Sequence, residues 1–97
     1  MPKGYWIALV DVHDTAAYDL YRQANAAPFA EYGARFLARG GPQEVVEGQA
    51  RKRSVILEFP TIEAARACYA SPGYQAAKAL RLNAADGDII IVEGYAG

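Results

Sequence analysis

The stretch GYWIALVDV, residues 4–12, decides the fold because it is apolar on both faces of an extended chain. In a strand, successive side chains point to opposite faces. Positions 5, 7 and 9 carry tyrosine, isoleucine and leucine, and positions 6, 8 and 10 carry tryptophan, alanine and valine. A run of this kind is typical of a central strand that is covered on both sides.

Two further segments have the same two-sided apolar character. They are RSVILEF at residues 53–59 and IIIVEGY at residues 89–95. Pro60 ends the first, and the Asp-Gly-Asp turn expected at residues 86–88 precedes the second. Both segments are therefore predicted to be strands of the same sheet.

A shorter, interrupted strand is predicted between the first helix and residue 53. ARFLAR at residues 34–39 reads as extended, Gly40-Gly41-Pro42 breaks it, and QEVVE at residues 43–47 is expected to resume it. A turn over residues 48–51 then leads into the next strand. The second and third strands are thus expected to form a hairpin.

Helical segments are predicted in the two connections between strands. The first runs over residues 15–32, with Asp14 as its N-cap and Gly33 as its end. Pro28 lies inside that span, and because it has no N–H to donate to Ala24 it is expected to kink or split the helix there.

The second connection carries two start signals. Thr61 is expected to cap one helix, whose apolar stripe includes Cys68 as a buried thiol. Ser71 followed by Pro72 marks a fresh start, which predicts a short helix over about residues 72–82.

The resulting order is β-α-β-β-α-β. It predicts an α+β, ferredoxin-like fold in which a four-stranded antiparallel sheet carries its helices on one face. The 97 residues are enough for one domain, so residues 1–97 are taken as a single unit.

The second face of this sheet needs a cover, because the helices shield only one side. A patch of several hundred Å² of apolar surface left in water would forgo on the order of 10 kcal/mol, which rivals the stability of a small domain. A second copy related by a two-fold axis would cover it and make a homodimer. The alternative is a monomer whose open face holds a ligand or an unrelated partner.

Composition excludes several classes of partner. The net charge of -1 offers no basic face for nucleic acid, and no apolar run approaches the length of a membrane span. One cysteine and one histidine cannot form a common metal site within one chain, so neither metal nor cofactor is expected. The absence of a leader-like apolar segment favours a cytoplasmic protein.

Two residues near the hairpin are the first candidates for chemistry. Glu58 follows three apolar residues in a strand, so it is either a pocket acid or base or a carboxylate paired with Arg39 or Arg53. Arg39 lies beside two glycines and could clamp a carboxylate ligand, or it could be a solvated strand-end charge or the partner of Glu58.

The remaining candidates are a histidine, a second arginine and a set of aromatic residues. His13, in the turn after the first strand, is a possible general base or an exposed loop residue. Arg53 could contact a ligand or be a surface charge. Aromatic side chains with polar tips suit the lining of a pocket for a flat ligand and equally suit a core or a dimer interface; the candidates are Trp6, Tyr18 and Tyr21.

Several runs, taken in order, resemble a known family. They are RGG at residues 39–41, RSVILEFP at 53–60, EAA at 63–65, YASPGYQ at 69–75 and VEG at 92–94. Together they resemble the DUF1330 family, a domain of unknown function, over essentially the whole chain. The resemblance implies membership of the dimeric α/β-barrel superfamily, with Cys68 as a departure where such proteins often carry tryptophan.

Three functions are compatible with these observations. The first is a dimeric protein that binds a small organic ligand in a cavity beside the sheet. The second, which the superfamily likeness implies, is a cofactor-independent monooxygenase or isomerase acting on a small aromatic or carboxylic substrate. The third is a purely structural or regulatory dimer.

Overall fold

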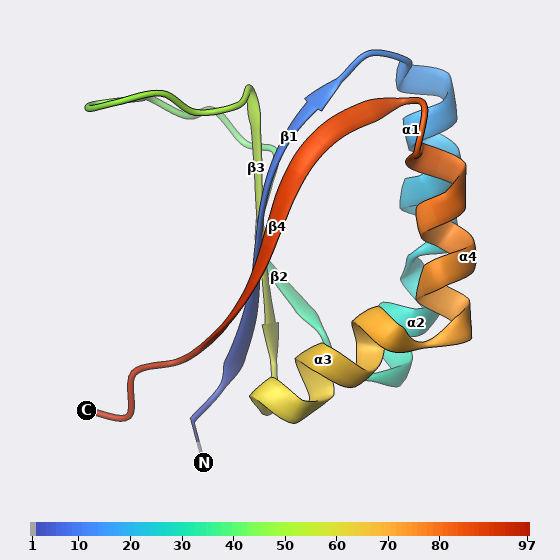
Figure 1. Ribbon diagram of the computed structural model, residues 1–97. Helices are drawn as coiled ribbons and strands as arrows, with labels where there is room; N and C mark the ends of the chain where they lie inside the picture. Colours follow the sequence, from blue (N-terminus) through green and yellow to red (C-terminus); the bar gives the residue numbers. More distant parts are fainter. Residues whose placement is uncertain (1) are drawn as a thin grey trace.

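The computed structural model describes residues 2–97, and this part of the chain folds into one sheet and two helical connections (Figure 1). The strands are β1 (Gly4–Val12), β2 (Arg35–Arg39), β3 (Arg53–Phe59) and β4 (Ala85–Glu93). The helices are α1 (Thr15–Ala24), α2 (Ala26–Glu31), α3 (Ile62–Ala70) and α4 (Pro72–Arg81). Each of the two helical connections is divided into two helices. With each connection counted once, the order is the predicted β-α-β-β-α-β of a ferredoxin-like fold.

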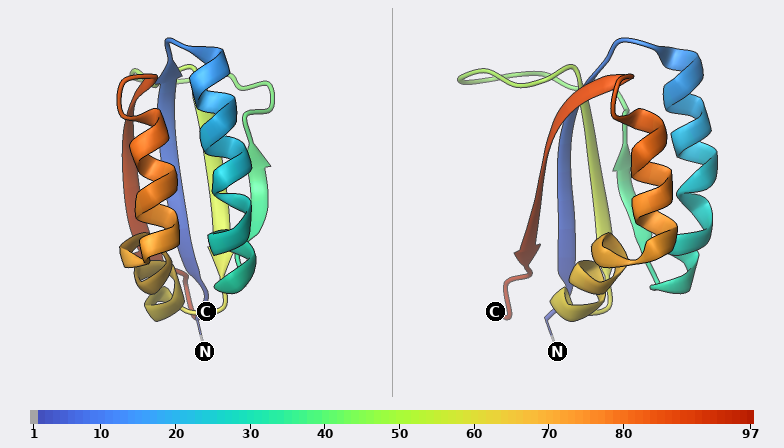
Figure 2. Two further views of the ribbon diagram at one scale, coloured as in Figure 1. Left: turned by 90° about the vertical axis from the view of Figure 1, so that its right-hand side faces the viewer. Right: turned by 45° about the vertical axis from the view of Figure 1, so that its right-hand side comes forward.

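The sheet has the strand order β2-β3-β1-β4, and all its pairs are antiparallel. β1 occupies a central position, as its two-sided apolar sequence predicts. Trp6 lies opposite Leu57 and Ile91, whereas Ile7 lies opposite Ile56 and Ile90. All four helices cover one face, with α1 and α4 side by side across it (Figure 2).

The first helical connection begins and ends where predicted but divides earlier. The Asp14 carboxylate accepts a hydrogen bond from the Ala17 N–H at 3.1 Å, and Gly33 ends the segment with a φ of 74°. The break falls at Asn25 rather than at Pro28. Pro28 instead lies in the first turn of α2, where a missing N–H costs no helical hydrogen bond.

The second helical connection follows its capping signals. The Thr61 hydroxyl accepts from the Ala64 N–H at 3.1 Å, and the Ser71 hydroxyl accepts from the Tyr74 N–H at 3.2 Å. Cys68 lies on the buried side of α3, as predicted, and burial raises the pKa of its thiol to about 11. The thiol is therefore protonated near neutral pH.

Two sequence predictions for the strands are wrong. Residues 43–47 do not resume β2; residues 40–52 form an irregular segment, here named the arm, that projects from the sheet away from the helices (Figure 1). An isolated two-stranded ribbon beyond a sheet edge is marginal, which explains why no strand forms there. The expected turn at residues 86–88 is instead extended, because β4 starts at Ala85 and pairs along the full length of β1.

The helix-covered face of the sheet holds an aromatic core. Trp6 is 1% exposed, and its indole N–H donates to the Ala65 carbonyl oxygen at 2.9 Å. Its ring contacts Phe29 and Tyr74 edge to face, with centroids 5.3 and 4.9 Å away. This cluster joins β1 to α2 and α4 and fixes the distance between sheet and helices.

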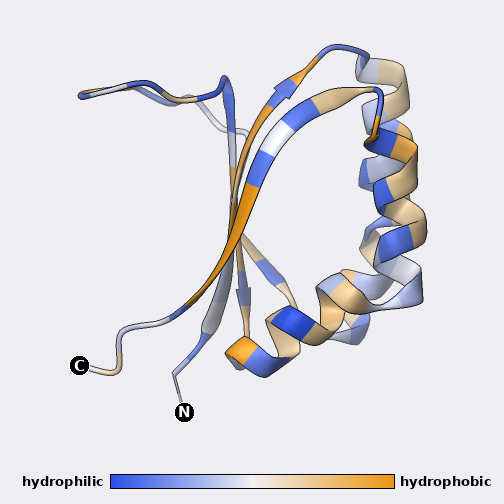
Figure 3. Ribbon diagram, in the orientation of Figure 1, coloured by the Kyte–Doolittle hydropathy of each residue, from blue (hydrophilic) through white to orange (hydrophobic). Residues whose placement is uncertain are grey.

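The opposite face, here named the open face, has no helix over it (Figure 3). Ile90 is 56% exposed and Val92 is 40% exposed, and both lie on this face beside Ile7 and Tyr5. The apolar second face that the sequence predicts is therefore present, and the sheet of one chain does not close into a barrel. Within residues 2–97, no helix combines the length and apolarity that crossing a membrane requires.

Candidate functional site

A cavity of about 270 Å³ lies between the helix-covered face of the sheet and the helices. Strands supply its floor, α1 and α4 supply much of its wall, and α2 and α3 contribute one aromatic residue each. The floor residues are Trp6, Ala8, Val10, Phe36, Arg39, Arg53, Val55, Leu57, Ala85, Gly87 and Ile89. The wall residues are Tyr18, Tyr21, Arg22, Asn25, Phe29, Tyr69, Lys78 and Arg81.

The charges in this lining are all of one sign. Five of the ten lysines and arginines of the chain line the cavity, and none of its eleven aspartates and glutamates does. The five are Arg22, Arg39, Arg53, Lys78 and Arg81. Cations enclosed by low-dielectric aromatic walls attract an anion more strongly than the same cations would in open water.

Three of the cations gather where β2 ends and β3 begins. Burial lowers the pKa of Arg39, and the neighbouring charges of Arg22 and Arg53 lower it further. The Arg39 guanidinium lies 4.1 Å from the centroid of the Phe36 ring, and the Arg53 guanidinium lies 5.5 Å from that of Tyr18. The arginines at this end are therefore held by aromatic faces while they repel one another.

Gly40 provides the space that this arrangement needs. A Cβ at this position would lie 2.1 Å from an Arg53 guanidinium nitrogen, and its φ of 71° is in the left-handed region. The structure shows that Gly40 makes the bend and leaves room for Arg53.

A second group of polar side chains lies along α4. The hydroxyl oxygens of Tyr21 and Tyr74 are 2.8 Å apart, and Arg81 donates a hydrogen bond to the Tyr74 hydroxyl at 3.2 Å. Lys78 donates to the Tyr69 hydroxyl at 3.0 Å. Burial, followed by the proximity of Tyr21, raises the pKa of Tyr74, so this phenol stays protonated.

The structure brings five of the sequence candidates together. Each lines the same cavity, although they come from β1, α1, β2 and β3: Trp6, Tyr18, Tyr21, Arg39 and Arg53. Burial raises the pKa of Tyr18, so its hydroxyl is neutral and can donate or accept a hydrogen bond. The arrangement can bind a flat organic anion, because rings and cations alternate around one space.

Four polar lining residues were missed in the sequence: Arg22, Asn25, Lys78 and Arg81. A signal for them exists. Residues 18, 21, 22 and 25 recur at helical spacing, as do residues 74, 78 and 81. Polar side chains that share a face with buried tyrosines are expected to point toward the interior.

Glu58 lies outside the cavity, on the open face. Its carboxylate is 3.3 Å from a guanidinium nitrogen of Arg35 and accepts a hydrogen bond from the Tyr5 hydroxyl at 3.1 Å. The predicted partners, Arg39 and Arg53, belong to the other face, so the ion-pair prediction named the wrong arginines. For Arg39 the cause is a register shift in β2. Arg35 lies directly opposite Glu58, but the pairing shifts between Phe36 and Ala38, which places Arg39 opposite Val55.

His13 also lies away from the cavity. It is exposed in the turn after β1, where its imidazole Nε2 is 2.6 Å from an Asp86 carboxylate oxygen. The pair ties the β1–α1 turn to the start of β4. Among residues 2–97, no group of three or more histidine, cysteine, aspartate or glutamate side chains is placed to hold a metal ion.

Comparison with solved structures shows the same fold at low sequence identity. A protein of unknown function from Rhodopseudomonas palustris matches with a TM-score of 0.77 and 19% identity, over 99% of this chain and 85% of the other. SnoaB, a cofactor-independent oxygenase from Streptomyces nogalater, matches with a TM-score of 0.66 and 14% identity, over 100% and 97%.

A third structure, described as a dimeric protein of unknown function with a ferredoxin-like fold from Bacteroides fragilis, matches with a TM-score of 0.62 and 13% identity, over 94% of this chain and 95% of the other. No curated protein matches the sequence significantly. The family model described as a domain of unknown function, DUF1330, matches residues 3–95, and the chain therefore belongs to that family.

Proposed function

We propose that this protein is a homodimer that binds a small organic molecule in the cavity between its sheet and its helices. The observation that carries the proposal is the lining: aromatic rings and five cations line one partly open cavity of about 270 Å³. An apolar cavity of about 150 Å³ is large enough to hold benzene. The space therefore suits a ring system of one or two rings with substituents.

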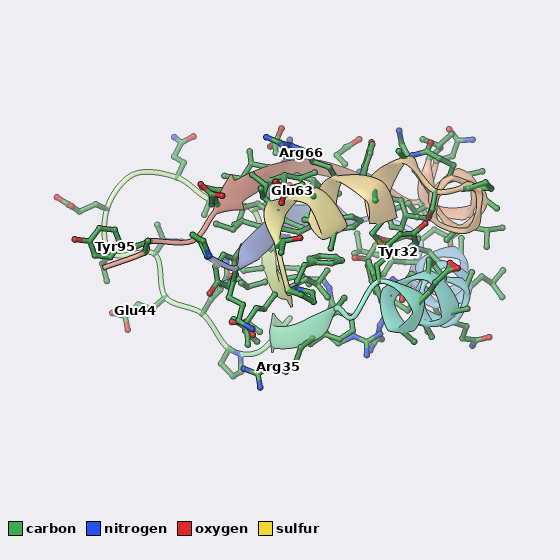
Figure 4. All side chains as sticks on the ribbon, turned by 90° about the horizontal axis from the view of Figure 1, so that it is seen from below. Tyr32, Arg35, Glu44, Glu63, Arg66 and Tyr95 are labelled. Carbon is green, nitrogen blue, oxygen red and sulfur yellow. The ribbon has the colours of Figure 1, made fainter. Side chains whose placement is uncertain are left out.

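The homodimer is supported by the open face and by what surrounds it. The arm and the C-terminal segment both project on the side away from the helices, where Glu44 and Tyr95 mark them in Figure 4. Val46 in the arm is 81% exposed. A second copy placed on this face would cover the apolar side chains of both sheets and close them into a barrel.

Structural neighbours support the same assembly. The Bacteroides fragilis protein and a ferredoxin-like protein from Thermobifida fusca are both described as dimeric. The assembly is tested by sedimentation at micromolar concentration, where we expect two subunits per particle. A single stable subunit under those conditions would contradict the proposed dimer.

Ligand binding is tested by thermal-shift screening with aromatic and carboxylic metabolites. We expect stabilisation by some of them, because a ligand that binds only the folded state raises its stability. Val10→Phe is expected to abolish that shift, since Val10 lines the cavity and is 7% exposed. Leu82→Phe, at a position that is 59% exposed, is the control. An undiminished shift in Val10→Phe would place the ligand elsewhere.

A second candidate is cofactor-independent oxygenation of a phenolic substrate. The cations would lower the pKa of a bound phenol and favour the electron-rich phenolate. In that reaction the substrate supplies all four electrons to O₂; one oxygen atom becomes a quinone oxygen and the other leaves as water. SnoaB is described as a cofactor-independent oxygenase and shares the fold.

The two candidates differ in oxygen consumption. For the oxygenase, Arg39→Ala is expected to lower O₂ uptake with a phenolic probe, because Arg39 lines the cavity. Glu58→Gln is the matched variant on the open face and is expected to leave uptake unchanged, because Glu58 pairs with Arg35 there. Binding without any O₂ uptake would rule out the oxygenase and retain ligand binding as the function.

A further inference from the structure

Three residues that line the cavity each carry a buried polar atom that has no partner in the protein. Within residues 2–97, three buried side-chain nitrogen or oxygen atoms lack a hydrogen bond: Nε of Arg22, Oδ1 of Asn25 and Nε of Arg53. All three residues line the cavity. Buried polar atoms in native proteins are nearly always paired, so their concentration in one space indicates a missing binding partner.

Asn25 is the most informative of the three. It is 4% exposed and lies at the N-cap position of α2, yet its side chain makes no capping hydrogen bond. An asparagine at that position would ordinarily satisfy an N–H of the helix. Leaving a buried amide oxygen unpaired is destabilising, so a ligand group that donates a hydrogen bond to Oδ1 would be bound more tightly than one that cannot.

The two unpaired arginine nitrogens are donors. They belong to the group at the junction of β2 and β3, where Arg22 and Arg53 together lower the pKa of Arg39. Asp19 contacts Arg22 at 3.3 Å through Nη1, and that pair lies at the surface, so it leaves the Arg22 Nε unsatisfied. A planar carboxylate matches the fork geometry of guanidinium groups and would offset their mutual repulsion.

We infer that the ligand is a flat aromatic carboxylic acid that also carries a hydroxyl group. Its carboxylate is held by Arg53 with Arg39 and Arg22, its rings lie against the aromatic lining, and its hydroxyl donates to Asn25 Oδ1. This assignment rests on the proposed function, because it names the chemical class of ligand for the same cavity. It requires no metal or cofactor and no covalent step.

The test is calorimetric titration of the full chain with three naphthalene probes. The first, 6-hydroxy-2-naphthoate, carries both a carboxylate and a hydroxyl group. The second, 2-naphthoate, carries the carboxylate alone, and the third, 2-naphthol, carries the hydroxyl alone. We expect 2-naphthoate to bind about fivefold more weakly than 6-hydroxy-2-naphthoate, and 2-naphthol at least about tenfold more weakly, because hydrogen bonds to charged groups contribute more than neutral ones. These comparisons use the unmodified protein and do not depend on any variant folding.

Three variants locate the two contacts. Arg53→Met is expected to remove the preference for the carboxylate probes over 2-naphthol. Asn25→Leu is expected to remove the fivefold difference between the two carboxylates and to leave 2-naphthoate binding intact. Arg66→Met, at an exposed arginine of α3 that is labelled in Figure 4 and does not line the cavity, is the charge-matched control and is expected to change neither ratio.

The outcomes separate this inference from the proposed function. Equal affinity for all three probes, or a carboxylate preference that survives Arg53→Met, would overturn the ligand class. If Val10→Phe still abolishes binding of those probes, cavity binding stands without the class assigned here. Failure of all three probes to bind would overturn the inference, and the wider metabolite screen would then decide the proposed function independently.

Discussion

On the open face of the sheet, Arg35 and Arg51 lie against carboxylates, whereas on the helix-covered face Arg39 and Arg53 lie against aromatic rings and have no carboxylate partner. Arg51 reaches from the arm to Asp11 and Asp88, with nitrogen–oxygen distances of 3.0 Å to both. Its hydrogen bond to Asp88, together with that to Asp11, raises the pKa of Arg51. The paired charges fix strands and the arm in place, and the unpaired ones are available to a ligand.

The apolar residues of the two faces differ in the same way. The helix-covered face is fully buried within one chain, because Trp6, Leu57 and Phe59 are each at most 2% exposed. The open face carries a comparable apolar sequence but leaves Ile90 more than half exposed. One face is therefore stabilised by folding, and in the proposed dimer the other would be stabilised by association; four predictions test that division.

The largest effect is expected from Trp6→Ala. Removing this side chain opens a void in the aromatic core and leaves the Ala65 carbonyl without its indole donor, so the free energy of unfolding should fall by about 3–5 kcal/mol. Urea denaturation at two protein concentrations measures it. The loss should not depend on concentration, whereas the loss for Ile7→Ala, its neighbour on the open face, should. Equal concentration dependence would contradict the division.

The next effect is expected from Ile90→Lys. In the proposed dimer, a lysine at this position would bury a charge without a partner on the open face, which is costly. The dissociation constant of the dimer should rise at least about a hundredfold, with the fold of each subunit retained. Light scattering coupled to size-exclusion chromatography measures it. Leu82→Lys, outside the open face, is the control; a dimer unaffected by Ile90→Lys would place the interface elsewhere.

A smaller effect, of opposite sign, is expected from Arg53→Met in the absence of ligand. The substitution removes an unpaired buried Nε and one of the charges that repel Arg39. The free energy of unfolding should rise by about 0.5–1 kcal/mol, because residues that serve binding are often not the most stabilising ones for the fold. Chemical denaturation measures it. A clear loss of stability would mean that Arg53 is a structural residue.

The smallest effect is expected from Arg35→Gln. The Arg35–Glu58 pair joins directly opposed residues of β2 and β3, but the Arg35 side chain is 71% exposed. Such a pair contributes about 0.2–1 kcal/mol, and salt screens it. Denaturation at low and high salt should show a small loss that fades as salt increases. A loss that persists at high salt would indicate a packing role.

Much of the fold follows from local patterns in the sequence. β3 and the start of α4 lie where the apolar run of residues 53–59 and the Ser71-Pro72 start signal predict them. The failures are at positions where a distant partner decides the conformation. Asp86-Gly87-Asp88 is typical of a turn, but β1 is long enough to pair with it and hold it extended.

The candidate site was predictable only in part. The sequence suggests aromatic residues and Arg39, and these do line the cavity. Asn25 shares helical spacing with Tyr18 and Tyr21, but no local pattern shows that its amide is left without a partner at the break between α1 and α2. Nor does the sequence show which arginine meets Glu58, since that depends on the register between β2 and β3.

Local patterns account for the order of the strands along the chain, the caps at Asp14, Thr61 and Ser71, and the two-sided apolar sheet, because each depends on the spacing and type of neighbouring residues. Which charges are paired between distant segments depends on the tertiary structure. Strand register and helix docking bring residues 22, 39 and 53 into one space without an acid, and they place Glu58 against Arg35 on the other side. Pairing of this long-range kind depends on distances across the fold, which no local pattern encodes.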